Sequence, residues 1–258
     1  MIITLLTDFG TRDYFVGAMK GVILSVNENA SIVDITHEIA PQNIRAAAFT
    51  LKNYYKNFLQ GTIHVCVVDP GVGSNRRAIL VETEDYCFVA PDNGLLSFVL
   101  AEQENFRAFE LNNTEFFHYP VSQTFHGRDI FAPVAAHLSN GVLPEELGTE
   151  IDDLATFEIS VPRAVGETKI EVEIIHIDHF GNLVTNLKAE DLPEKFYLEA
   201  GENRIERHQR FFTEAEKSEI FSITGSAGFL EIAAFQDSAE KLLNAKTGEK
   251  VYLIKQGN

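Results

Sequence analysis

The residues best suited to chemistry lie in one stretch, where Asp69 is followed within eight residues by Arg76 and Arg77. A nearby arginine favours the charged form of an aspartate, and a positioned carboxylate can orient a water molecule and accept its proton. The apolar, β-branched run of residues 63–68 just before Asp69 is typical of a strand buried on both faces. Because Asp, Pro and Gly also dominate turns, a simple turn is the alternative interpretation.

Further polar side chains follow other predicted strands. Asp8, Asp92 and the group His126, Arg128 and Asp129 all fall at or just after the end of an apolar run. Ligands of open α/β sheets bind outside the carboxyl ends of the strands, so these turns are expected to converge on one edge. Taken singly, each has a structural alternative: a cap for Asp8, a hydrogen-bonded core histidine for His126, and an ion pair between Arg128 and Asp129.

The usual signatures of metal, phosphate and serine chemistry are absent from the sequence. It contains no HExxH, CxxC or carboxylate-rich calcium loop, no Walker or GxGxxG pattern, and no GxSxG elbow. Five side chains could in principle gather around a metal, although their spacing matches no known motif: Asp8, His37, His64, Asp69 and His126. The sequence therefore predicts a site without a metal.

Composition narrows the class of protein. The 258 residues carry a net charge of −17, which would repel a phosphate backbone and disfavours nucleic acid as a partner. No apolar run approaches the roughly 20 residues of a membrane span, and the amino-terminal residues do not resemble a signal peptide. Cys66 and Cys87 both lie in apolar runs, so they are predicted to be small core residues in a reducing, cytoplasmic compartment.

Strand and helix patterns alternate through the first part of the chain, which predicts a Rossmann-like αβα fold with a mostly parallel sheet. Asp13 is a candidate cap for the first helix. The expected strands are residues 2–6, 32–35, 63–68, 78–82, 86–90 and 106–111, and the expected helical stretches are 14–26, 44–58, 95–100 and 130–138.

The pattern changes beyond residue 150, where turn formers replace periodic apolar residues. We therefore expect an α/β domain over residues 1–160, a linker over 161–167 and a second domain over 168–258. Short strand patterns with little helix run through residues 171–177, 196–198, 221–223, 230–233 and 251–254. They predict a mostly antiparallel, β-barrel-like domain.

Six motifs in a fixed order resemble those of the S-adenosylmethionine hydroxide adenosyltransferases, relatives of the halogenating enzymes that use the same substrate. The motifs are TDFG at residues 7–10, VDPGVG at 68–73, APDNG at 90–94, FHGRD at 125–129, DHFGN at 178–182 and GSAGFLE at 225–231. The resemblance implies hydrolysis of S-adenosyl-L-methionine to adenosine and L-methionine, with no cofactor. It also implies a homotrimer whose active sites lie between the amino-terminal domain of one subunit and the carboxy-terminal domain of the next.

The resemblance also implies roles for individual residues. Asp69, Arg76 and His126 match an aspartate, an arginine and a histidine that hold the attacking water in the family. A sulfonium departs as a neutral thioether, so this chemistry needs a placed water in a dry pocket and no general acid.

Substrate-binding roles follow from the same comparison. Asp8 matches the residue that binds the ribose hydroxyls, and the loop around Asp13 lies toward the methionine. Asp178 matches a partner of the methionine ammonium, Asn182 a hydrogen-bonding partner of adenine, and Ser226 a residue near the methionine end. The backbone of residues 234–236 corresponds to a segment that reads adenine, while Asp92, Asn93, Arg128 and Asp129 are expected to be structural.

Three alternatives remain open on the sequence. The chain could bind S-adenosylmethionine or adenosine without turnover, or act as a metal-dependent hydrolase through its Asp and His turns, or act as a halogenase. A halide beside the Asp69 carboxylate would meet like charge, which costs on the order of 4 kcal/mol at a separation of 4 Å near a protein surface. Asp69 therefore favours hydroxide over halide.

Overall fold

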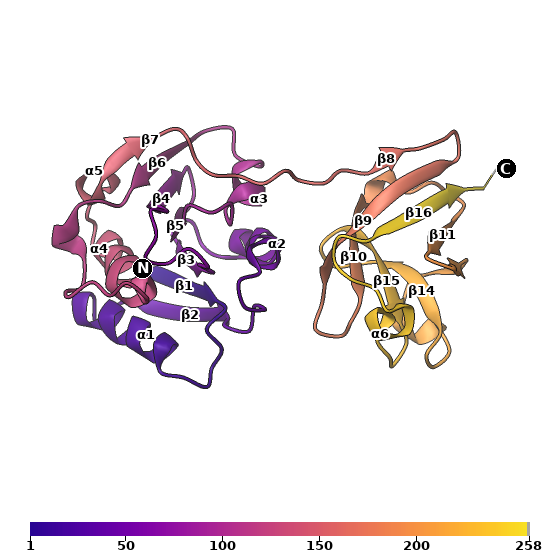
Figure 1. The fold of residues 1–258 in the computed structure, drawn as a ribbon, viewed down its shortest axis with the longest axis horizontal. Coiled ribbons are helices and arrows are strands. Elements are labelled where there is room, and N and C mark those ends of the chain that lie inside the picture. Colours follow the sequence, from indigo (N-terminus) through magenta and orange to yellow (C-terminus); the bar gives the residue numbers. More distant parts are fainter. Residues whose placement is uncertain (257–258) are drawn as a thin grey trace. The chain divides into compact units, whose positions relative to one another are not determined.

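The computed structural model describes residues 1–256, and the chain divides into two compact units. The first unit covers Met1–Glu158, and the second begins at Ile159. Each unit has its own sheet (Figure 1) and its own apolar core.

The first unit is built on a seven-stranded sheet in the order β2-β1-β3-β5-β4-β6-β7. The strands are β1 (Ile2–Thr7), β2 (Ser31–Thr36), β3 (Ile63–Val67), β4 (Ala78–Thr83), β5 (Cys87–Pro91), β6 (Phe106–Glu110) and β7 (Thr149–Ile151). The sheet is mixed, because three neighbouring pairs are parallel and three are antiparallel. The prediction of a mostly parallel sheet is therefore wrong for β4, β6 and β7. The turn between β4 and β5 is too short for a parallel crossover.

Helices cover both faces of this sheet, so the αβα layering is as predicted (Figure 1). Their bounds are α1 (Phe15–Val26), α2 (Ile44–Tyr54), α3 (Ser97–Leu100), α4 (Ala132–Ser139) and α5 (Pro144–Leu147). Successive strand residues point to opposite faces: Leu5 and Val65 pack with α1 and α4, and Leu6 and Cys66 pack with α2 and α3. Within residues 1–256, no helix has the length and apolar character needed to cross a bilayer.

Several local expectations need correction. Asp13 does not cap α1, whose N-cap residue is Tyr14 and has no side-chain cap. The helix expected over residues 44–58 ends at Tyr54 and continues as a 3-10 turn, Tyr55–Asn57. Cys66 is fully buried as predicted, whereas Cys87, at the first position of β5, is only partly buried.

The second unit is a curled, nine-stranded sheet with the order β12-β11-β16-β9-β10-β15-β14-β13, and β8 pairs with β9. Its elements are β8 (Arg163–Ala164), β9 (Lys169–Ile177), β10 (Leu183–Lys188), β11 (Phe196–Ala200), β12 (Asn203–Ile205), β13 (His208–Gln209), β14 (Ile220–Thr224), β15 (Phe229–Ala234), α6 (Ala239–Leu243) and β16 (Lys250–Lys255). All pairings except β13 with β14 are antiparallel, in agreement with the predicted strand arrangement. No pairing within the described chain closes this sheet into a full barrel.

A histidine without charge lies in the core of the first unit. His64, on β3, is fully buried, and its Nδ1 lies 2.8 Å from Thr4 Oγ1. Five aromatic rings surround the imidazole: Tyr54, Tyr55, Phe58, Tyr86 and Phe88. Burial lowers the pKa of His64 from 6.5 to about 3, so the folded state holds a neutral ring.

We expect acid to destabilise the protein through this side chain. Because the folded pKa lies below the unfolded value, the unfolded state binds the proton more tightly. The stabilisation is complete above pH 6.5 and is lost as pH falls toward 3, by up to about 1.4 kcal/mol per pH unit. Urea unfolding from pH 7 to pH 4 should show a smaller slope of stability against pH in His64→Gln than in the parent.

The matched control is Thr4→Val, which removes the hydrogen bond to the ring but leaves the histidine in place. It should lower stability at every pH and keep the slope. An unchanged slope in His64→Gln would assign the acid sensitivity to other groups.

Candidate active site

The structure brings Asp69, Arg76 and His126 into direct contact. Arg76 Nε donates to the two carboxylate oxygens of Asp69 at 3.0 and 2.8 Å, and its Nη2 also donates to Asp69 Oδ2. The same Nη2 lies 2.7 Å from His126 Nδ1. The side chains of Arg76 and Asp69 are only 10% and 5% exposed, so the ion pair is largely shielded from solvent.

The contact with Arg76 defines which ring nitrogen of His126 carries the proton. A guanidinium can only donate, so His126 Nδ1 accepts and the ring proton resides on Nε2. The pKa of His126 is lowered, first by burial and then by the Arg76 charge. Asp69, Asp129 and a hydrogen bond with the Ser122 backbone act in the opposite direction. The lowered pKa favours a neutral imidazole beside the ion pair of Arg76 and Asp69.

Two loops pack closely to form this cluster. The turn after β3 is held by Val72 N donating to Asp69 O, and Gly73 adopts a positive φ of 76°. A Cβ at Gly73 would come within 2.3 Å of Gln123 O, in the loop before His126. Only glycine lets the backbones of the two loops approach this closely.

Asp129 anchors the second loop. It is fully buried and accepts hydrogen bonds from Ser122 N at 2.8 Å and from Arg128 Nε at 2.6 Å. These contacts agree with the expected ion pair between Arg128 and Asp129 at the start of a helical segment. They fix the loop whose backbone bonds to His126.

A second ion pair supports the first loop. Arg77 Nε and Nη2 donate to Asp92 Oδ2 at 2.9 and 2.6 Å, and Arg77 also binds Asp153. Asn93 Nδ2 donates to Val68 O at 2.9 Å, one residue before Asp69. Asp92 and Asn93 are therefore structural in this unit, as the sequence suggests, because their polar atoms bind protein groups.

Asp8 leaves β1 at the same edge of the sheet as Asp69 leaves β3, because the two strands are parallel neighbours. Its Oδ2 accepts a hydrogen bond from Gln42 N at 2.8 Å, and its side chain is partly exposed. Asp13 lies exposed in the following loop. Among the described residues, no hydrogen bond or ion pair joins Asp8 or Asp13 to Asp69, Arg76 or His126.

In the second unit, Asp178 and Asn182 share the turn between β9 and β10. Asp178 Oδ1 accepts from Phe180 N and Asn182 N, both at 2.9 Å, and Oδ2 accepts from Asn182 Nδ2 at 2.9 Å. Ser226 lies exposed in the turn between β14 and β15. The sequence analysis gave no role to Glu231, a buried acid on β15 whose side chain lies against Gly225, although a single charge within an apolar strand is a visible signal.

The five side chains considered for a metal do not gather. His64 is the second residue of β3, whereas Asp69 lies two residues beyond the end of that strand. His37 is bound to Thr7 at 2.9 Å and to Asp34 at 3.1 Å. Over residues 1–256, no group of three or more His, Cys, Asp or Glu side chains is placed to hold a metal ion.

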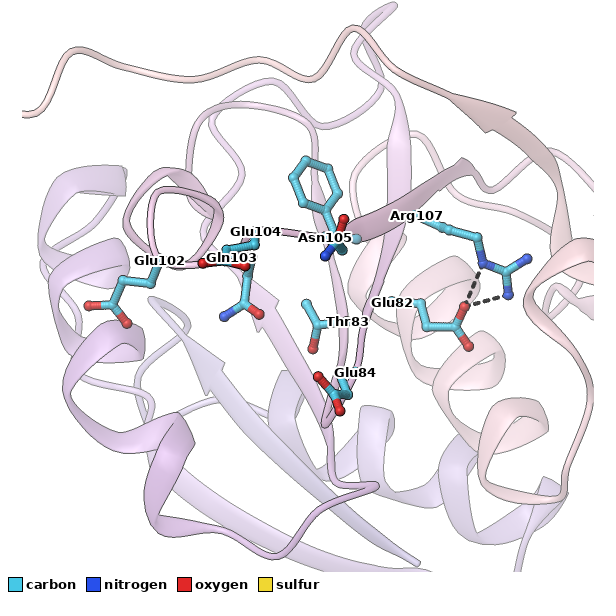
Figure 2. A pocket seen from close by; sticks show the side chains of 9 residues that line it. Glu82, Thr83, Glu84, Glu102, Gln103, Glu104, Asn105 and Arg107 are labelled. Carbon is cyan, nitrogen blue, oxygen red and sulfur yellow. Dashed lines mark hydrogen bonds and ion pairs between the residues drawn. The ribbon is translucent and has the colours of Figure 1, made fainter.

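A cavity of about 550 Å³ lies elsewhere on the first unit (Figure 2). Four glutamates line it, namely Glu82, Glu84, Glu102 and Glu104, and Figure 2 shows Arg107 turned toward Glu82. The cavity adjoins the end of β4, which runs antiparallel to β5, so it lies at the sheet edge opposite Asp92. It contains none of the residues assigned to the candidate site.

Comparison with known proteins places both units in one family. Residues 3–148 match the model of the SAM hydroxide adenosyltransferase N-terminal domain, and residues 172–252 match that of its C-terminal domain. A solved structure of an uncharacterized conserved protein from Thermotoga maritima is similar with a TM-score of 0.90 and 36% identity. That match covers 99% of this chain and 100% of the other.

Curated relatives carry more specific names. The chain is 39% identical to (R)-S-adenosyl-L-methionine hydrolase of Methanocaldococcus jannaschii, over 98% of this chain and 95% of the relative. It is 36% identical to the enzyme of the same name from Thermus thermophilus, over 96% of this chain and 98% of that relative. A fluorinase from an Actinoplanes species is 29% identical over 74% of this chain and 73% of the relative.

Substitution of Gly73 tests the close approach of the two loops. Gly73→Ala should lose clearly more stability than Gly141→Ala, because both positions have positive φ but only Gly73 has backbone within contact distance. We expect about 1 kcal/mol for Gly141→Ala from its backbone conformation and a further loss of about 1–3 kcal/mol at Gly73 from the clash. Urea unfolding measures both, and equal losses would contradict the packing described here.

Proposed function

The chain belongs to the SAM hydroxide adenosyltransferase family, and we propose that it hydrolyses S-adenosyl-L-methionine to adenosine and L-methionine. The family and the hydrolase activity are supported by full-length relatives at 34–39% identity that are named (R)-S-adenosyl-L-methionine hydrolase. The observation that carries the mechanism is the cluster in which Arg76 binds both oxygens of Asp69 and the ring of His126.

In the proposed reaction, water attacks C5′ of the ribose, opposite the sulfonium. A bond forms between the water oxygen and C5′, while the bond from C5′ to sulfur breaks with its electron pair going to sulfur. Methionine leaves as a neutral thioether and needs no proton. The proton lost is that of the water, and Asp69 orients this water and accepts the proton.

Arg76 and His126 act on this water indirectly, because they fix the geometry of the cluster that holds it. Arg76 holds the Asp69 carboxylate in one orientation through hydrogen bonds to both oxygens. His126 Nδ1 accepts a hydrogen bond from Arg76, which fixes the orientation of the ring and leaves the ring proton on Nε2. In-line attack depends on such fixed geometry, since a misplacement of about 1 Å can cost 100-fold in rate.

The charge of the Asp69 carboxylate favours hydrolysis over halogenation. The buried Asp69 would repel a halide ion brought beside it, and its two oxygens suit the hydrogens of a water molecule. Fluorinase is the name of relatives at 27–29% identity that match about three quarters of this chain. We therefore propose hydroxide transfer and not halide transfer for this protein.

For the substrate, we propose that Asp8 binds the ribose hydroxyls and that the Asp13 loop faces the methionine. In the second unit, Asp178 and Asn182 would contact the methionine ammonium and the adenine, and Ser226 would lie near the methionine end. Support for these roles is the match of each residue to the family motifs. The carboxylate of Asp8 retains acceptor capacity beyond its bond to Gln42, as binding to a diol requires.

We also propose a homotrimer with active sites between subunits, no metal and no cofactor, and a cytoplasmic location. The trimer rests on the family resemblance. The location is supported by the free Cys66 and Cys87, which suit a reducing compartment.

The activity is tested with purified protein and S-adenosyl-L-methionine in H₂¹⁸O. We expect equal amounts of adenosine and methionine, with one ¹⁸O atom at the 5′ oxygen of adenosine, because the oxygen comes from water. The two sulfonium epimers should be assayed separately, since the relatives' names specify the (R) form. Chromatography with mass spectrometry measures products and label.

Each alternative gives a different result in this assay. Saturable binding without product would indicate a binding protein, and activity lost in a chelator and restored by a divalent ion would indicate a metal-dependent hydrolase. A halogenated adenosine formed only with added halide would indicate a halogenase. Adenosine without the ¹⁸O label would contradict attack by water on C5′.

The role of Asp69 is tested with Asp69→Asn, which keeps the shape of the side chain and removes its charge. We expect turnover to fall by about 10²–10⁴-fold, the usual contribution of a proton acceptor, while the dissociation constant for substrate changes little. The matched control is Asp92→Asn, which weakens the neighbouring ion pair with Arg77. That variant should lose stability and keep most of its turnover, and equal losses of turnover in both would reject the assignment.

A further inference from the structure

The proposed reaction gives no role to a buried histidine at the end of β2. His37 directly follows the last residue of β2 and is only 5% exposed. Its Nδ1 lies 2.9 Å from Oγ1 of Thr7, the fully buried last residue of β1. Because β1 and β2 are parallel neighbours, the two side chains meet at the sheet edge where Asp8 leaves β1.

The other side of the His37 ring faces an acid. His37 Nε2 lies 3.1 Å from Asp34 Oδ1, and Lys20 Nζ donates to Asp34 Oδ2 at 2.5 Å. Burial acts to raise the pKa of Asp34, but the contacts with Lys20 and His37 outweigh it and lower the pKa. A carboxylate only accepts, so the ring proton is on Nε2, and in the neutral ring Nδ1 accepts from the Thr7 hydroxyl.

His37 holds the turn that carries Asp8 from both sides. On one side, Thr7 Oγ1 bonds to the ring and also accepts from Phe9 N at 3.2 Å. On the other side, Gly10 N donates to the main-chain oxygen of His37 at 2.7 Å. Asp8 therefore lies between two residues that are both bonded to His37.

The carboxylate of Asp8 depends on this turn for its direction. Gln42 N at 2.8 Å is the one hydrogen-bond donor to that carboxylate among residues 1–256. Two carboxylate oxygens can meet two adjacent hydroxyls only in a narrow range of orientations, because hydrogen bonds weaken steeply when misaligned. A residue that recognises a ligand in this way needs neighbours that hold it in place.

We propose that His37 is a positioning residue for ribose recognition. Through Thr7 and Gly10 it fixes the turn that presents Asp8 to the two ribose hydroxyls, and Asp34 and Lys20 fix the ring in turn. This inference rests on the proposed function, in which Asp8 binds those hydroxyls. It gives a role in substrate selection to a side chain that does not touch the substrate.

The test compares adenosine with 2′,3′-dideoxyadenosine, which lacks both hydroxyls, by calorimetry. His37→Phe keeps an aromatic ring in the site and removes both nitrogens. The dissociation constant of adenosine should rise about 10-fold, the size of one hydrogen bond lost through misalignment. For the dideoxy compound, parent and variant should bind alike, because the contact that His37 supports is absent.

A conservative variant and a matched control accompany this comparison. His37→Asn keeps a polar atom near the position of Nδ1, so it should still bond to Thr7 and recover most of the affinity for adenosine. The control is His64→Phe, which replaces the second buried histidine that bonds to a β1 threonine, Thr4. It should lower stability and leave the ratio of the two dissociation constants unchanged.

Kinetics give a reading that separates positioning from chemistry. With S-adenosyl-L-methionine, His37→Phe should raise KM by the same factor and leave kcat nearly unchanged, because the ribose hydroxyls take no part in the bonds that form and break. If the parent protein forms no adenosine, the hydrolase proposal fails, and the calorimetry with the two nucleosides still tests His37.

Four results overturn the inference. They are an equal loss of affinity for both nucleosides in His37→Phe, no loss for adenosine, an Asn variant as weak as the Phe variant, and a parent protein that does not prefer adenosine.

Circular dichroism checks that each variant is folded. Should His37→Phe not fold, Thr7→Val replaces it, because this variant removes the hydrogen bond to the ring with little change of shape. A loss confined to adenosine then supports the inference, and an equal loss or no loss overturns it.

Discussion

The contact between the Arg76 guanidinium and the Asp69 carboxylate is the interaction on which the candidate site depends. It lies in a shielded position at the end of β3, where an isolated charge of either sign would be unfavourable. Because the guanidinium also reaches His126, one cation sets the orientation of the carboxylate and the protonation of the ring. The rest of the first unit serves to keep this arrangement in place.

That support is largely polar and comes from the ends of neighbouring elements. Asp92 binds Arg77 beside the first loop, and Asp129 binds Ser122 within the second. Both acids are buried and fully engaged by protein donors, as buried polar groups usually are.

The proposed chemistry explains why so few groups are needed. A sulfonium leaves as a neutral thioether, so the site requires no general acid and no oxyanion stabilisation. An acceptor for the water proton, a fixed geometry and exclusion of bulk water are sufficient in principle. The Asp69 cluster offers the first two, and its low exposure is consistent with the third.

The sequence by itself determined the alternating elements, the αβα layering and the order of the motifs, because periodicity and turn residues are local properties. It also indicated Asp69, Arg76 and His126, although the histidine is 50 residues from the arginine in the chain. The tertiary structure decided the rest: the reversed direction of β4 and β7, which makes every pairing from β5 to β7 antiparallel, and the failure of Asp13 to cap α1. Strand direction, burial and the distance between charges depend on how distant segments pack, so no local pattern contains them.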